Sequence, residues 1–496
     1  MSEKFFWADQ IAENIIKQKG NKKEYVCASG ITPSGQIHIG NFREIITTDM
    51  VVRALRDKGK KVRFIYSWDD YDRFRKVPVN IDPSFEKYLG MPVSEVPSPT
   101  GKKGESYAKF FEKDFEKSLK KVFIEPEYIY QNEMNKKCKY AKLIKKALDK
   151  KEIIRKILNK YRREPLKKDW LPLTLYCEKC YKDSTKILNI KDYEITYECA
   201  CGHKDKIDFR KKGLIKLQWR VDWPMRWTYE KVDFEPGGAD HSAAGGSFDT
   251  GKQIAKEVFN YPAPMYQMYE WIKIKGGKAF SSSIGNILTL DDVEEIYEPE
   301  VLRYLFCGTK PKSAFQISFD LDVIKIYEDF DALERKYFER KVNKMQKRMY
   351  EMSVVNIPKK QPKRVSFRHL ITLVQLKKTK DLNEVSKKRA EKVKNWLDKY
   401  ADENMKFEIQ EKIKFPFSGK EKKALIELRE ALKTKEFSAE ELFNEFYTIC
   451  EKINIKNTEF FRAAYQAIIG KEKGPRLAEF ILLIGKDKII KLLEQL

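Results

Sequence analysis

A loop between an apolar run and a helix constrains the fold of this chain most. Residues 24–30 (EYVCASG) form a short apolar run that ends in Gly and is typical of a buried strand. The loop ITPSGQ follows, residues 39–58 have a helical pattern closed by Gly59, and residues 61–66 (KVRFIY) alternate like a second strand. Strand, loop, helix and strand in this order predict a βαβ unit, the start of a parallel sheet.

The loop and helix start, GITPSGQIHIGN, carry the strongest chemical signal. They lie at the carboxyl edge of the predicted sheet, where open α/β folds bind ligands. Backbone N–H groups and the helix dipole favour phosphate there. His38 and Asn41 can hydrogen-bond the phosphates of a nucleotide, and Gly40 lets an adenine ring approach the backbone. The alternative is a Gly-rich turn that only connects strand to helix.

HIGN resembles the HIGH signature of class I aminoacyl-tRNA synthetases, and the stretch ASGITPSGQIHIGNFREIITTDMV is similar to the class I lysyl-tRNA synthetases in particular. The resemblance runs from about residue 4 to 495 and is looser between 330 and 450. It implies an α/β fold: a Rossmann-type parallel-sheet catalytic domain with a zinc-ribbon-containing insertion, then an all-α anticodon-binding region. It also implies ATP contacts at Pro33, Gly35, His38, Gly40, Asn41, Gly245 and Ser281.

An acidic run, SWDDYDRFRKVP, follows the second predicted strand and shares the same sheet edge. Asp69 and Asp70 can receive a substrate ammonium group or a ribose, whereas the alternative is a solvated acidic turn. Class I lysyl enzymes have a similar run, DDYDPLRKVP. This chain departs from it by having Arg73 and Phe74 where Pro and Leu are usual.

A third region combines WRVDWPMRW with PGGADHSAAGGS. Trp219 can wall the aliphatic stem of a lysine, and the alternative is a set of core tryptophans beside a flexible Gly loop. The family is similar here but usually has Lys where this chain has Ala239. Carried over position by position, the resemblance implies that bound lysine contacts Gly30, Thr32, Asp69, Asp70, Trp219, Asp240, His241 and Tyr269.

The segment KGGKAFSSSIGN resembles the KMSKS loop of the family, whose lysines neutralise the leaving pyrophosphate. The match departs where Ala279 and Ser282 take the two Lys positions, although Lys278 lies one residue before the first of them. The alternative is a structural Gly-Ser loop. With the HIGN residues, the expected catalytic set is His38, Asn41, Lys278, Ser281, Ser282 and Ser283.

Four of the eight cysteines form two close pairs, and a hairpin-like run, ILNIKDYEITYE, lies between the pairs. This arrangement predicts a zinc ribbon, and a closed site of this kind is structural. Cys199 with Cys201, or Cys199 with His203, would complete the tetrahedron, and the alternative is ordinary reduced cysteines. The candidate ligands are Cys177, Cys180, Cys199, Cys201 and His203.

Composition suggests the partners, and the change of sequence pattern along the chain suggests the domain organisation. Lys plus Arg number 99 against 74 Asp plus Glu, so the net charge of +25 favours a polyanionic partner over a surface tuned only for solubility. Basic helices with scattered aromatics in the C-terminal half can dock RNA. The expected domains are 1–95 and 214–290 (catalytic), 96–213 (inserted helical and zinc-ribbon module), 291–355 (helical stem-contact region) and 356–496 (α-helical anticodon-binding domain).

These observations predict a lysyl-tRNA synthetase that uses ATP, Mg²⁺, L-lysine and tRNA(Lys) and carries a structural Zn²⁺. The start of the chain lacks a signal-peptide pattern and the apolar stretches are short, so we expect a cytoplasmic protein without membrane contact. We also expect a monomer. The alternatives are a class I synthetase for glutamate or arginine, a nucleotidyltransferase of the same fold, or a catalytically weakened tRNA-binding relative.

Overall fold

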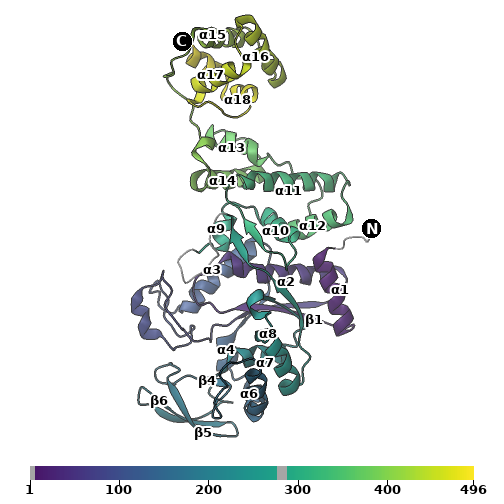
Figure 1. The fold of residues 1–496 in the computed structure, drawn as a ribbon, viewed down its shortest axis with the longest axis vertical. Coiled ribbons are helices and arrows are strands. Elements are labelled where there is room, and N and C mark those ends of the chain that lie inside the picture. The colour runs from purple at the N-terminus through teal and green to yellow at the C-terminus, as the bar shows by residue number, and fades with distance from the viewer. Residues whose placement is uncertain (1–5, 276–286) are drawn as a thin grey trace. The chain divides into compact units, whose positions relative to one another are not determined.

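A computed structural model of the chain describes residues 6–275 and 287–496 (Figure 1). The chain divides into two compact units: Met1–Ile317 with Lys336–Ile357, and Ser318–Arg335 with Pro358–Leu496. No helix in the described ranges combines the length and the apolar character needed to cross a membrane.

A five-stranded parallel sheet forms the centre of the first unit. Its order is β10-β9-β1-β2-β3, with β1 Tyr25–Ile31, β2 Val62–Trp68, β3 Glu127–Tyr130, β9 Phe234–Gly238 and β10 Met265–Tyr269. Helix α2 (Ile39–Asp57) connects β1 to β2, which confirms the predicted βαβ unit and the α/β fold class. Strand β3 lies within residues 96–213, which the sequence assigned to an inserted helical and zinc-ribbon module, and a four-residue edge strand is too short to show a period.

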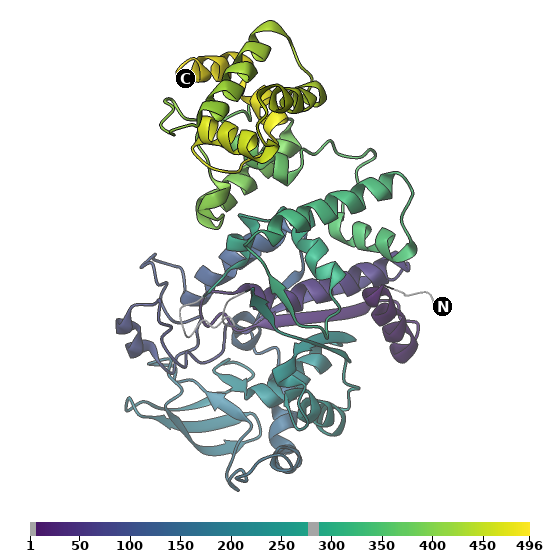
Figure 2. The ribbon, with the colours of Figure 1, turned by 45° about the horizontal axis from the view of Figure 1, so that its top comes forward.

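Helices pack around this sheet, as the turned view in Figure 2 shows. Trp223 and Trp227 of one helix form a core cluster with Val26, Ala28 and Ile65 of the two central strands. The helices of the first unit are α1 Trp7–Lys19, α3 Tyr107–Lys121, α4 Gln131–Lys136, α5 Ala141–Asp149, α6 Lys151–Asn159, α7 Trp219–Glu230, α8 Ser247–Ile254, α9 Leu290–Glu294, α10 Pro299–Gly308 and α12 Lys344–Val354. A short parallel pair, β11 (Ile272–Ile274) and β12 (Phe315–Ile317), completes the unit.

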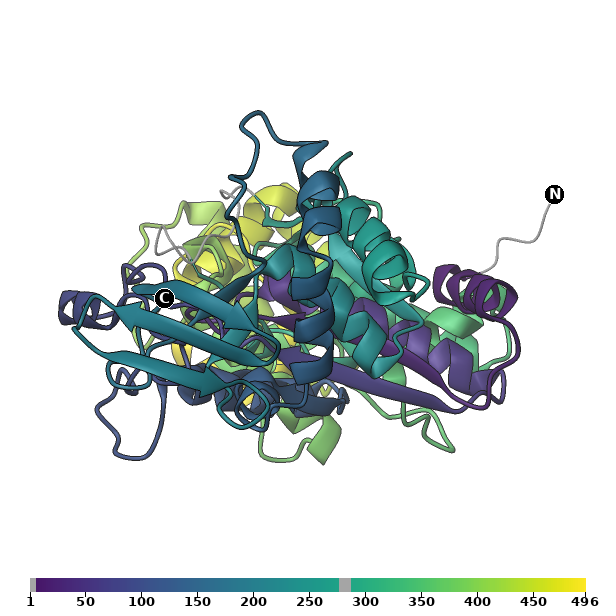
Figure 3. The same ribbon diagram turned by 90° about the horizontal axis from the view of Figure 1, so that it is seen from below.

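The cysteine-bearing segment forms a small module within the first unit. Strands β5 (Thr185–Lys191), β6 (Glu194–Cys199) and β7 (Lys204–Asp208) make an antiparallel sheet, which Figure 3 shows with its three strands side by side. Strands β4 (Leu173–Leu175) and β8 (Ile215–Leu217) pair at the base of this module. The predicted hairpin between the two cysteine pairs is thereby confirmed.

The second unit is helical in its described residues. It comprises most of α11 (Asp322–Phe338), with α13 Phe367–Gln375, α14 Glu384–Lys399, α15 Gly419–Thr434, α16 Ala439–Ile453, α17 Asn457–Ile469, α18 Leu477–Ile484 and α19 Lys486–Leu493. Trp396 is an aromatic residue of α14, in the basic helical half that the sequence suggested for docking RNA. It is fully buried instead, and its indole N–H donates to the carbonyl of Phe319 at 2.9 Å, so it holds the core together.

Candidate active site and metal centre

A cavity of about 410 Å³ opens at the carboxyl ends of the central strands. Parallel α/β sheets place their ligand sites at this edge. Nine of the residues singled out from the sequence line it: Gly30, Thr32, Gly40, Asn41, Asp69, Trp219, Asp240, His241 and Tyr269. Ten further residues complete the lining, among them Glu44, Asp72, Arg73, Arg75 and Lys76.

The HIGN residues form the turn that starts α2. His38 precedes the first helical residue, and its backbone N–H donates to Oδ1 of Asn41 at 3.3 Å, which fixes the first turn. Burial lowers the pKa of His38, so the ring stays neutral near pH 7. A Cβ on Gly40 would lie 2.8 Å from two atoms of the His38 ring, so only Gly fits there. His38 itself is not in the cavity lining.

Glu44, which sequence reasoning missed, lines the cavity. Its two carboxylate oxygens accept hydrogen bonds from the backbone N–H of Gly30 at 3.0 Å and from the hydroxyl of Tyr269 at 2.7 Å. Burial, opposed by these hydrogen bonds, raises the pKa of Glu44 to about 8. Its position on α2, one turn after HIGN, was the available signal.

The two adjacent aspartates of the acidic run after β2 have separate roles. Asp69 accepts two hydrogen bonds from the guanidinium of Arg226, and Arg226 also donates to the Ser67 hydroxyl at 2.7 Å. Asp70 is buried away from the cavity, where the backbone N–H of Asn132 donates to it at 2.8 Å at the start of α4. Asp69 therefore supports the cavity floor, whereas Asp70 ties the sheet to a neighbouring helix.

Aromatic side chains form one wall of the cavity. Trp219 begins α7 and stacks on Trp223 with ring centroids 5.1 Å apart, and the His241 ring lies 6.1 Å from Trp219. Glu235 of β9 accepts hydrogen bonds from the indole N–H groups of Trp223 at 3.0 Å and Trp227 at 2.6 Å. The wall is thus held in one orientation by a buried carboxylate, whose pKa burial raises to about 7.

Three cations, Arg73, Arg75 and Lys76, line the open side of the cavity and are exposed to solvent. They favour an anionic group at the mouth, as phosphates would be. The remaining predicted residues lie elsewhere. Pro33, Gly35 and Gly245 are outside the lining, and Lys278, Ser281, Ser282 and Ser283 fall outside the described residues.

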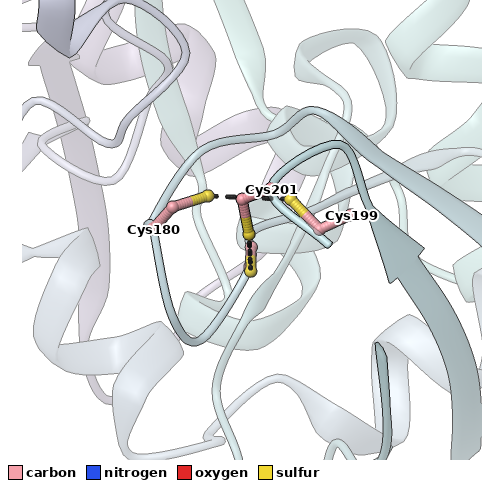
Figure 4. A group of neighbouring side chains, drawn as sticks. Cys180, Cys199 and Cys201 are labelled. Atoms are coloured by element: carbon pink, nitrogen blue, oxygen red, sulfur yellow. Dashed lines mark hydrogen bonds between the residues drawn. The ribbon is translucent and has the colours of Figure 1, made fainter. Parts of the chain in front are cut away.

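The four sulfurs of the cysteine module converge, as the close-up in Figure 4 shows. Their Sγ atoms all lie within 4.8 Å of one another, with Cys177 and Cys201 at 3.8 Å and Cys180 and Cys199 at 3.6 Å. His203 groups instead with Glu178 and Asp205. Of the two completions left open by the sequence, the structure therefore favours Cys201 over His203. Four convergent thiols fit a tetrahedral metal site.

Comparison with known proteins agrees with this geometry. The family model of the tRNA synthetases class I (K) matches residues 5–356. The chain belongs to this family. A second model, the anticodon binding domain, matches residues 369–496.

Curated relatives match along nearly the whole chain. A lysine--tRNA ligase from Borrelia garinii subsp. bavariensis is 45% identical, over 99% of this chain and 99% of the relative. The lysine--tRNA ligase of Thermococcus kodakarensis is 41% identical, over 98% of each chain. Among solved structures, a glutamate tRNA ligase from Elizabethkingia meningosepticum superposes with a TM-score of 0.50 at 13% identity, covering 96% of this chain and 99% of that one, which supports the shared fold.

Proposed function

We propose that this chain is a lysine--tRNA ligase that activates L-lysine with ATP and transfers it to the 3′-terminal adenosine of tRNA(Lys). Two observations support the proposal. The relatives that carry this name align with almost the full chain, at 37–45% identity. The cavity lining includes Glu44, which is a suitable partner for the ammonium group of a lysine side chain.

Lysine recognition follows from the layout of the cavity. The side-chain ammonium would lie against Glu44 and Tyr269, and the aliphatic stem against Trp219. An ammonium group and a carboxylate form a charge-assisted hydrogen bond, which is worth about 1.5–3 kcal/mol. Glutamate would bring a second carboxylate to Glu44, and like charges repel. Glu44 therefore favours a cationic amino acid in this cavity.

ATP would lie across the turn that starts α2. Gly40 leaves room for the adenine, Asn41 and the α2 N-terminus can hydrogen-bond phosphate, and Arg73, Arg75 and Lys76 add positive charge. His38 shapes this turn as a neutral ring. Mg²⁺ would shield the phosphate charges. We keep Lys278, Ser281, Ser282 and Ser283 in the proposal as the segment that contacts pyrophosphate.

The chemistry has two steps. A carboxylate oxygen of lysine bonds to the α-phosphorus of ATP, the bond to the bridging oxygen breaks, and pyrophosphate leaves. A hydroxyl oxygen of the 3′-terminal adenosine, the 2′-hydroxyl in the usual class I pattern, then bonds to the lysyl carbonyl carbon. AMP leaves and the hydroxyl proton is released. Positioning and charge stabilisation are sufficient for both steps, without a covalent intermediate on the protein.

The cysteine tetrad would hold one structural Zn²⁺. Cys177, Cys180, Cys199 and Cys201 supply four thiolate ligands, which leaves no position for a water molecule. The metal would join the two cysteine turns of the module. A reducing compartment keeps these thiols available, which agrees with the proposed cytoplasmic location.

The remaining domains would recognise tRNA. We propose that residues 291–355 contact the stem and residues 356–496 bind the anticodon, in agreement with the anticodon-domain match. A cavity of about 830 Å³ in the second unit includes Arg368, Lys471, Lys473 and Arg476 in its lining, and such cations suit a phosphate backbone. We propose a monomer, which light scattering with and without tRNA would check.

Amino-acid-dependent ATP–pyrophosphate exchange tests this function. The protein is assayed with lysine, arginine and glutamate in turn, with and without tRNA, and charging of tRNA is measured in parallel. We expect exchange and charging with lysine alone. Exchange with arginine or glutamate would assign another synthetase, and tRNA binding without exchange or charging would indicate a non-catalytic relative.

A further inference from the structure

A buried lysine contacts the loop after β2, which contributes Asp72 to the cavity lining. Lys216 belongs to β8, at the base of the cysteine module, and only 3% of it is exposed. Its ammonium donates to Oδ1 of Asp72 and lies 3.8 Å from Oδ2 of Asp222. Buried lysines are rare unless their charge is compensated, so this position needs the two carboxylates.

Asp72 connects this lysine to the cavity surface. Its other carboxylate oxygen, Oδ2, accepts a hydrogen bond from the hydroxyl of Thr32 at 2.7 Å, and both Asp72 and Thr32 line the cavity. Burial works to raise the pKa of Asp72, but the charge and hydrogen bond of Lys216, together with the Thr32 hydroxyl and the charge of Arg226, outweigh it and lower the pKa below its usual value. Asp72 therefore stays a carboxylate.

The charge on Asp72 determines what Thr32 can offer to a ligand. A hydroxyl has one proton, and Thr32 gives that proton to Asp72. The Thr32 oxygen can then only accept a hydrogen bond from the cavity. An accepting hydroxyl beside a carboxylate suits the α-ammonium group of an amino acid.

The loop after β2, which contains Tyr71, Asp72 and Arg73, has further contacts with the cysteine module. Arg73, which lines the cavity, forms an ion pair with Asp183 at 3.1 Å, and the Tyr71 hydroxyl donates to the carbonyl of Gly213 at 2.8 Å. Asp183 lies three residues after Cys180. The loop after β2 is therefore held by several contacts with the module. The contact made by Lys216 is the one that pairs buried charged groups.

We propose that Lys216 is a positioning residue for amino-acid binding: it fixes Asp72, and through Asp72 it orients the Thr32 hydroxyl as an acceptor for the α-ammonium of the substrate. The inference rests on the proposed function, because that function makes lysine the ligand. Lys216 does not contact the substrate, so its effect should appear in amino-acid affinity and not in ATP affinity.

The test is a double-mutant cycle on the full-length protein with Lys216→Met, Asp72→Asn and the double variant. Lysine affinity is measured by calorimetry, and the KM values for lysine and ATP are measured by pyrophosphate exchange. We expect Lys216→Met to weaken lysine binding about 30-fold or more and to change the ATP KM by less than about twofold. Because Lys216 acts through Asp72, the double variant should bind lysine within about twofold of Asp72→Asn alone. Lys212→Met, an exposed lysine of the same module, is the matched control and should leave both values unchanged.

Two results would overturn the inference. Equal changes in lysine and ATP affinity would indicate a general structural role, and losses that add in the double variant would show that Lys216 does not act through Asp72. If Lys216→Met does not fold, the double variant leaves no uncompensated carboxylate at position 72 and still gives the comparison with Asp72→Asn. Lysine binding by the wild-type protein tests the proposed function separately, before any variant is compared.

Discussion

The floor of the first unit's cavity and the rim of the second unit's cavity use charge in opposite ways. Beneath the first, Asp69, Asp222 and Arg226 are at most 8% exposed and are paired with one another. Around the second, Lys473 and Arg476 are exposed to solvent. Buried ion pairs fix a geometry and are little affected by salt. Exposed cations attract a polyanion, and salt screens this attraction. The first arrangement suits a small substrate and the second suits RNA.

The largest effect should come from breaking the buried network. Arg226→Met leaves Asp69 and Asp222 buried without that cation, so we expect the free energy of unfolding to fall by about 3–5 kcal/mol. Urea unfolding of the full chain measures it. The matched change Arg476→Met, at a side chain that is 87% exposed, should cost less than about 1 kcal/mol. Similar losses in both variants would remove the contrast between the two regions.

Metal content should follow the cysteine tetrad. We expect about one zinc per chain in the wild-type protein, and loss of tightly bound zinc in Cys201→Ser, because a serine hydroxyl is a poor replacement for a thiolate. His203→Gln is the control and should keep its zinc. Elemental analysis after dialysis decides between the two ligands. Retention in Cys201→Ser with loss in His203→Gln would reverse the assignment.

Lysine affinity should depend on pH through Glu44. Its pKa is raised to about 8 by burial, so below that value the carboxyl must lose a proton before it can pair with an ammonium. Lysine binding should therefore tighten by up to about tenfold per pH unit as pH rises from 6 towards 8. Calorimetry across this range checks the slope. Glu44→Gln should abolish it, and a slope that persists there would place the titrating group elsewhere.

The same raised pKa has a consequence for stability without ligand. The folded protein holds a proton on Glu44 that the unfolded chain, with an ordinary Glu pKa near 4.3, releases. The contribution of Glu44 to folding therefore falls as pH rises between that value and about 8. Saturating lysine should reduce this loss. Urea unfolding at pH 6 and pH 8, with and without lysine, measures it.

The smallest effect should come from a single exposed cation. Lys473→Ala should weaken tRNA binding only a few-fold and reduce the slope of log K against log salt by about one unit. Filter binding over a range of salt concentrations measures this slope. Lysine affinity should not change. A salt-independent loss would mean that Lys473 recognises a base and not a phosphate.

The sequence predicted those parts of the fold that depend on local pattern. β1, α2 and β2 follow each other directly, and the two cysteine turns have diagnostic spacing. What it missed depends on contacts between distant residues. In the sequence, Arg226 is only one residue of an aromatic run. Its role follows from its pairing with Asp69, 157 positions away. Glu44 was not singled out, because the contact that gives it a role is with Tyr269 of β10, 225 positions away.

The choice between Cys201 and His203 was beyond the sequence for a related reason. Both residues follow Cys199 closely, and only the path of the turn into β7 decides which of them reaches the other sulfurs. Lys216 had no local signal either, because a lysine in a short strand usually lies at the surface.

Glu44 should make the cavity selective for a lysine side chain. The most direct test compares the binding of lysine and norleucine, which lacks the side-chain ammonium, to the wild-type protein and to Glu44→Gln at pH 8. The wild-type protein should prefer lysine by about 100-fold, and Glu44→Gln should lose most of this preference while its norleucine binding changes little. Equal binding of the two ligands by the wild-type protein would contradict it.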